Sequence, residues 1–190
     1  TYREVFAYFE AAVYNRFDLP VRRLLLELSL FEDFDMEMVR MVSGDPRAGE
    51  RMDWLLRHTT MLRYDSRERF HFWAGFRAFL LWEMDREYTE EKRKALFSRG
   101  GLYYELKEDY AHALECYTKS GDHAKISELL IRNSEQHPGM GHYSEMEKYY
   151  RALPESEILA SPSLMQGMSM LCALAMDYEG SERWYGALKN

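Results

Sequence analysis

The chain has 190 residues, of which 46% are hydrophobic and 15% aromatic, enough apolar material for one or two packed domains and too much for a disordered chain. Its formal net charge of −7 argues against nucleic acid or an anionic membrane as the main partner of the whole chain. The sequence contains no run of about 18 apolar residues and no visible signal peptide. Cys116 and Cys172 fit no metal or redox spacing, so we expect buried thiols and a reduced, cytoplasmic compartment.

Apolar periodicity and capping residues predict four helices in the first half of the chain. They are expected over residues 2–16, from Asp18 to Leu30, from Asp35 to Gly44 and over about 49–59. The period then changes, because two short aromatic runs at 61–64 and 70–73 flank a polar segment. Such runs predict a β-hairpin. Helices followed by a hairpin are the layout of a winged helix, which we place at residues 1–88.

The second half has helical periodicity throughout, and a tetratricopeptide spacing begins within residues 90–106 and continues through 109–120. The residues that carry this spacing are Phe97, Gly101, Tyr104, Ala113, Tyr117 and Ser120. A weaker match recurs 74 residues later, at Leu171, Ala175, Tyr178 and Ala187. Further amphipathic helices are predicted at 123–135, at 142–152 and from Ser161 to about Met176. Residues 89–190 are therefore predicted to form an irregular helical-repeat domain, the start of a longer superhelix.

The fold class that we predict is all-α, a winged helix with one small β-hairpin followed by a tetratricopeptide-like α-superhelix. All seven lysines lie at or after Lys92, while 13 of the 18 arginines precede it, which is consistent with a module boundary near residue 90. Both ends of the sequence fall inside amphipathic patterns, so we expect a fragment of a longer polypeptide.

The order of these elements resembles the middle region of the MalT-like, LuxR-type bacterial transcriptional regulators, which are signal-transduction ATPases. Segment 18–26 (DLPVRRLLL) resembles the family's opening winged-helix segment, and segment 76–80 (FRAFL) resembles a later one. In the helical half the resemblance includes segments 111–117 (AHALECY), 152–154 (ALP) and 161–164 (SPSL). The resemblance implies an ATPase domain upstream and a helix-turn-helix downstream, with a superhelix between them that senses an inducer.

One position departs from the family. Related ATPases often have His-Pro-Leu just before segment 76–80, and this winged-helix histidine can contact bound nucleotide. Here the positions read Trp73, Ala74 and Gly75, and the nearby His71 lies two residues earlier. We interpret His71 as a hairpin residue without a ligand.

Three other groups of residues are candidate sites. Arginines of the hairpin and fourth helix can contact DNA phosphates, but interleaved carboxylates favour a solvated or docking surface. This group comprises Arg51, Arg57, His58, Arg63, Arg67 and Arg69. Aromatic residues of the helical half can stack on a sugar or peptide, although most are expected to pack between helices. They are Tyr103, Tyr104, Tyr110, Tyr117, Tyr149, Tyr150, Trp184 and Tyr185. His137 and His142 bracket a short loop and suggest no metal or acid–base site.

No phosphate-binding Gly-Lys-Ser/Thr loop occurs, so we predict no catalytic residue, no metal and no cofactor here, with ATP expected only in an upstream domain. The expected role is sensory and coupling: the winged helix docks on the ATPase domain, and the superhelix binds an inducer or partner protein. DNA would be contacted only through the downstream helix-turn-helix. Two alternatives stay open, a stand-alone helical-repeat adaptor for protein–protein interaction and a DNA-binding winged-helix protein.

Overall fold

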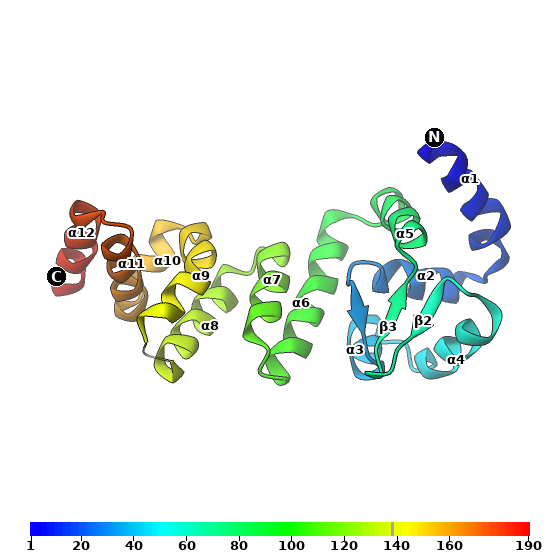
Figure 1. Cartoon of the computed structure of the whole chain (residues 1–190), viewed down its shortest axis with the longest axis horizontal. Helices are drawn as coiled ribbons and strands as arrows, with labels where there is room; N and C mark the ends of the chain where they lie inside the picture. The colour runs from blue at the N-terminus through cyan, green and yellow to red at the C-terminus, as the bar shows by residue number, and fades with distance from the viewer. Residues whose placement is uncertain (138) are drawn as a thin grey trace. The chain divides into compact units, whose positions relative to one another are not determined.

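The computed structural model describes residues 1–137 and 139–190, which divide into two compact units at Tyr103 and Tyr104 (Figure 1). Unit 1 contains α1 (Tyr2–Ala12), the 3-10 helix η1 (Tyr14–Arg16), α2 (Leu19–Leu28), β1 (Asp33–Phe34), α3 (Met36–Ser43), α4 (Ala48–His58), β2 (Leu62–Tyr64), β3 (Phe70–Phe72), α5 (Ala74–Glu87) and most of α6 (Glu90–Leu106). Unit 2 contains α7 (Tyr110–Ser120), α8 (His123–Gln136), α9 (Met140–Ala152), α10 (Glu155–Leu159), α11 (Pro162–Leu174) and α12 (Tyr178–Lys189). Among the described residues, no helix is both long and apolar enough to cross a membrane.

Unit 1 is a winged helix with a three-stranded antiparallel sheet in the order β1-β3-β2. The predicted hairpin is confirmed as β2 and β3, with Leu62 opposite Phe72 and Tyr64 opposite Phe70. The structure adds a third strand that the sequence did not predict, β1, which places Phe34 opposite Phe70. A strand of two residues between helices has too few positions to show an alternating pattern.

The predicted helix boundaries of the winged helix depend on capping side chains, and most are confirmed. The Asp18 carboxylate accepts a hydrogen bond from the Val21 amide at 3.1 Å, and Asp35 does the same for Met38 at 2.8 Å. Gly44 ends α3 in the left-handed conformation, with φ of 61°.

The predicted first helix, residues 2–16, is wrong in its last turn. The α-helix ends at Ala12, and η1 follows after Val13. Its apolar stripe is also only partly buried, because Phe9 is the one residue of α1 in the core, while Val5 is 49% exposed. Phe9 packs against Phe76 and Phe79 of α5, so α1 contacts the winged helix through a narrow line of side chains.

The first part of α6 belongs to the winged-helix unit. The Phe97 ring packs edge-on against Phe31, with 5.8 Å between ring centroids, and Leu96 is buried. The Arg99 guanidinium donates a 2.8 Å hydrogen bond to the Val42 carbonyl at the end of α3. The boundary predicted between residues 88 and 89 lies in the turn before α6, whereas these contacts continue the compact unit to Tyr103.

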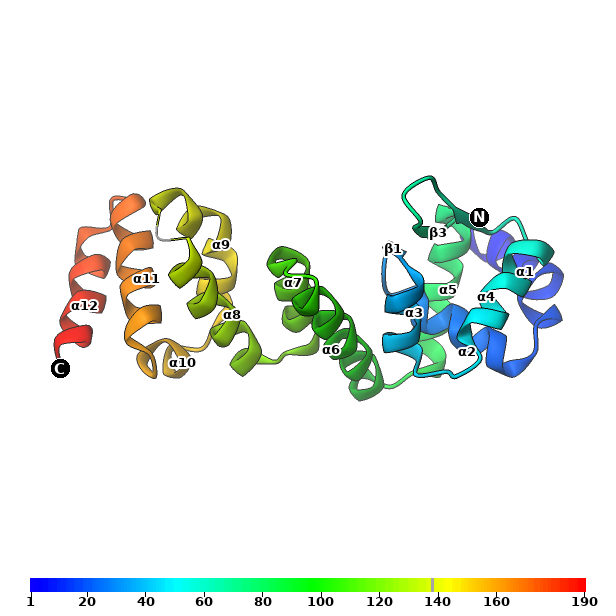
Figure 2. The same cartoon turned by 90° about the horizontal axis from the view of Figure 1, so that it is seen from below.

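Unit 2 is a stack of helices (Figures 1 and 2), and three of the described turns between helices share one local geometry. A left-handed residue, Glu108 or Met176, precedes an aspartate that caps the next helix, and Gly121 does so before Asp122. Each of these aspartates donates its amide to the carbonyl five residues earlier, at 2.8–3.1 Å. The shared turn identifies these as equivalent helix-to-helix joints.

These turns correct the predicted register of the second repeat. Asp177 follows Asp109 by 68 residues, twice the repeat length of about 34 residues. The 74-residue match of Leu171, Ala175, Tyr178 and Ala187 is therefore wrong: α11 ends at Leu174, before Ala175, and Tyr178 begins α12 with its side chain 66% exposed. In the 68-residue register Ser169 and Ser181 replace Gly101 and Ala113, and the Ser169 hydroxyl donates to the Ser181 carbonyl at 2.9 Å. A short helix that the sequence did not predict, α10, precedes this last pair.

The remaining predicted helices are confirmed to within a few residues, including 90–106 and 109–120. Gly139 caps α9, so part of the loop predicted between His137 and His142 is helical, and Pro138 lies outside the described residues. Inside unit 2, Ala113 and Tyr117 are buried in one apolar core that extends along the stack to Trp184.

Candidate functional site

The surface of a winged helix that reads DNA is formed by its helix-turn-helix pair and the hairpin, here α3, α4 and β2–β3. Most predicted cations on this surface are engaged within the protein. Arg51 donates to Asp45 at 2.6 Å, and the exposed Arg47 pairs with Glu50 at 2.8 Å. His58 and Arg57 contact carbonyls of their own helix, while Arg63 and Arg67 remain exposed. Few cations are left to displace the counterions of a duplex.

Arg69 is the centre of a network that joins β3, β1 and α6. Its guanidinium donates to Asp33 at 2.5 and 2.9 Å and to the Tyr103 hydroxyl at 3.1 Å. That hydroxyl donates to Asp35 at 2.6 Å. Burial and this bond to Asp35 raise the pKa of Tyr103 to about 12. Sequence analysis had placed Arg69 among solvent-facing cations, because its carboxylate partners lie more than 30 residues away.

His71 is also engaged inside the hairpin. Its Nε2 lies 2.5 Å from the Asp65 carboxylate, and this hydrogen bond, with those from two backbone amides, holds the pKa of Asp65 below its usual range. This contact agrees with the interpretation of His71 as a hairpin residue, since its ring already has a partner at the turn.

Exposed aromatic side chains gather on α1 and α5, and we call Tyr2, Tyr8, Trp73 and Trp82 the aromatic face. Trp73, which caps α5, is 50% exposed, and Trp82 is 41% exposed. Ring contacts connect them: Tyr2 and Trp82 both pack on Phe6, while Tyr8 and Trp73 both pack on Phe9. An exposed apolar patch of this kind is typical of a protein–protein contact.

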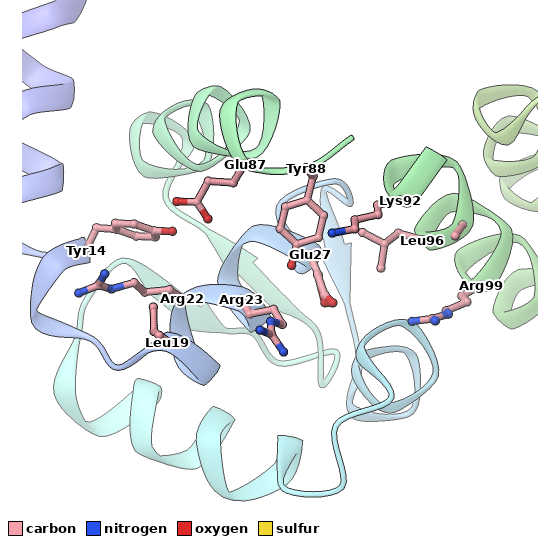
Figure 3. Close-up of a pocket in the computed structure, with 11 residues that line it drawn as sticks. Tyr14, Leu19, Arg22, Arg23, Glu27, Glu87, Tyr88, Lys92, Leu96 and Arg99 are labelled. Carbon is pink, nitrogen blue, oxygen red and sulfur yellow. The ribbon is translucent and has the colours of Figure 1, made fainter. Parts of the chain in front are cut away.

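A cleft of about 470 Å³ opens between α2, the end of α5 and the first part of α6 (Figure 3). Four cations line it, Arg22, Arg23, Lys92 and Arg99, against two carboxylates, Glu27 and Glu87. Tyr14, Leu19, Tyr88, Ala95 and Leu96 complete the wall. Sequence analysis missed this cleft, because its residues come from four segments and form no local motif.

One polar group inside the cleft, the hydroxyl of Tyr14, is buried without a hydrogen-bond partner among the described residues. The Tyr14 hydroxyl is fully enclosed, and its residue is 3% exposed. Glu27 is 7% exposed, and burial raises the pKa of its carboxyl to about 7 even though Arg99 and Arg23 lower it. Buried polar groups are usually hydrogen-bonded, so the Tyr14 hydroxyl is an exception that needs an explanation.

In unit 2 most of the predicted aromatic candidates pack between helices, as expected. Tyr117, Tyr149, Tyr150 and Trp184 are buried, and so is Tyr103 in unit 1. Tyr104 and Tyr110 are partly buried, and Tyr185 is 52% exposed.

The histidines and cysteines of unit 2 form no recognisable site. The His137 and His142 rings lie 4.8 Å apart, and His142 contacts Asn133. Within residues 1–137 and 139–190, no three metal-ligating side chains gather to hold an ion. Both cysteines are buried free thiols, and burial raises the pKa of Cys116 to about 12.

Comparison with known families matches the sequence model of the MalT winged helix domain to residues 10–92. No curated protein matches the chain in a sequence search. The match begins in α1 and ends in the first turn of α6, so it covers the sheet, the helix-turn-helix pair and α5. Residues 10–92 of unit 1 are therefore similar to the MalT winged helix domain, in line with the resemblance.

Proposed function

We propose that this chain is a non-catalytic regulatory region of a LuxR-type, MalT-like transcriptional regulator. The winged helix couples to the ATPase domain of the same protein, and the helical repeats bind an inducer or a partner protein. The match of residues 10–92 supports the family context. The observation that carries the proposal is that carboxylates engage Arg47, Arg51 and Arg69 on the helix-turn-helix and hairpin surface, since a winged helix with few free cations is suited to protein contacts.

The aromatic face is the surface that we assign to the ATPase domain. Its tryptophans offer large apolar area, and interface energy concentrates in such side chains. The proposal is tested by expressing the upstream segment of the same gene and measuring its binding to this chain by calorimetry. We expect W73A and W82A each to weaken binding by about tenfold or more. W54A is the matched control, because Trp54 is a similarly exposed tryptophan on α4 that stacks on His58.

The coding sequence upstream and downstream of this chain provides the first test of the proposal. A phosphate-binding loop upstream and a helix-turn-helix downstream are expected, and a gene without either contradicts the proposal. The DNA-binding alternative predicts duplex binding that weakens steeply with salt. Fluorescence anisotropy with a labelled duplex at low salt separates the two, since we expect no binding by this chain.

A further inference from the structure

Tyr14 and Glu27 are buried polar residues of the unit 1 cleft, and the Tyr14 hydroxyl has no hydrogen-bond partner among the described residues. The Tyr14 ring is held in place by Phe79, which packs edge-on against it, and by the Arg22 guanidinium over its face. Its hydroxyl lies near the Glu87 carboxylate but has no partner within ordinary hydrogen-bond geometry, and burial together with the Glu87 and Glu83 carboxylates raises its pKa. In Figure 3 this hydroxyl points into the cleft. An unmade hydrogen bond at a buried group destabilises the protein, and a ligand with a hydroxyl group can supply the missing partner.

The cations of the cleft differ in whether their side chains are already hydrogen-bonded to other groups of the protein. Arg22 donates to the carbonyls of Phe17 and Asn15, both at 2.8 Å, and Arg99 donates to Val42. The Arg23 and Lys92 side chains make no hydrogen bond or ion pair within the described residues, and both line the cleft. Four cations against two carboxylates give the cleft a positive balance in a chain whose net charge is −7. An anionic ligand therefore fits its charge.

We propose that this cleft binds a small organic anion that carries hydroxyl groups, with its anionic group against the cations of α2 and α6 and its hydroxyls against Glu27 and Tyr14. A volume of about 470 Å³ is within the range of small-molecule sites. The acid group is a carboxylate or a phosphate, which the cations recognise alike. The site lies in unit 1 and is therefore distinct from any inducer site on the helical repeats of unit 2.

The test uses the whole chain and four probes: glucose 6-phosphate, gluconate, glucose and inorganic phosphate. Calorimetry or a thermal-shift titration measures their binding. We expect glucose 6-phosphate or gluconate to bind at least about tenfold more tightly than glucose and inorganic phosphate, because the site uses charge and hydroxyls together. Which of the two binds better distinguishes a phosphate ligand from a carboxylate.

Two variants connect the binding to the cleft. K92A is expected to weaken the binding of the tighter of the two anions by about tenfold, whereas K94A is expected to leave that affinity unchanged. Lys94 is the matched control, since it lies on the same helix outside the cleft and pairs with Glu90 at 3.6 Å. Y14F is expected to weaken binding without lowering the melting temperature of the free protein, because the hydroxyl has no partner to lose.

Each opposite result overturns the proposal. Absence of binding by both anions at millimolar concentration does so, as does glucose binding as tightly as its phosphate. Equal effects of K92A and K94A would place the anion elsewhere, and Y14F with unchanged affinity would remove the hydroxyl contact.

Discussion

Replacing Glu27 by glutamine should make the stability of unit 1 less sensitive to a rise in pH from about 4.5 to about 7. Glu27 has its pKa raised from 4.5 to about 7, chiefly by burial, and Arg99, Arg23 and Asp45 are the charged groups that act on it. A carboxyl whose folded pKa lies above its unfolded pKa binds more protons in the folded state. Its contribution to stability is therefore lost as the pH rises from about 4.5 to about 7, and it changes little above that.

The size of the effect follows from the two pKa values. Each unit of pKa difference corresponds to about 1.4 kcal/mol. Ionising the buried carboxyl thus costs roughly 3 kcal/mol at pH 8 but less than about 1 kcal/mol at pH 5. Glutamine keeps the side-chain volume and has no such ionisation, so the stability of E27Q relative to the wild type should rise by about 2.5 kcal/mol between these pH values.

The assay is urea unfolding followed by tryptophan fluorescence at pH 5 and pH 8. In a W184F background the three remaining tryptophans, Trp54, Trp73 and Trp82, all lie in unit 1, so the signal reports that unit alone. E32Q is the control, because it removes an exposed carboxylate from the segment just after α2. A stability difference between E27Q and the wild type that is the same at both pH values would refute the reasoning.

Three further outcomes are expected. G167A should lower the stability of unit 2 by about 1–3 kcal/mol, because a Cβ there would lie 2.6 Å from the Tyr150 ring; G186A, with no atom within 4 Å of the added Cβ, is its control in the same thermal melt. Y103F should cost about 1–2 kcal/mol in urea unfolding of unit 1, and no loss would mean that the hydroxyl network is solvated. Cys116 should resist iodoacetamide at pH 8 until the protein unfolds, since its pKa is raised to about 12; rapid labelling of the native protein would contradict its burial.

Features that depend on local chemistry were predicted well from the sequence. Asp18 and Asp35 are caps because short polar side chains satisfy free amides wherever a helix begins, and Gly44 ends a helix because it adopts positive φ without strain. The hairpin is also a local feature: the two short aromatic runs predicted it because a period of two is visible within four residues.

Features that depend on distant partners could not be predicted in this way. Phe97 fits a repeat signature, yet its ring contacts Phe31, which is 66 residues earlier. The sequence places Glu27 on the polar side of an amphipathic helix, where it would face solvent. In the structure it is buried, because residues near the turn between α5 and α6 cover it. The second repeat match failed because small and aromatic residues are common in helices, so a four-residue spacing recurs in the wrong register.

The charge distribution of unit 1 explains how a winged helix can serve a protein partner. DNA binding gains most of its free energy from counterions that free cations displace. In this unit Arg51 is held by Asp45 in the turn before α4, and Arg69 is held by Asp33 of β1, which removes those cations from a duplex. The same ion pairs are only partly exposed, so salt should affect them less than it affects surface pairs. We therefore expect the folding stability of unit 1 to change little at high salt, whereas the DNA affinity of a winged helix that binds DNA falls steeply.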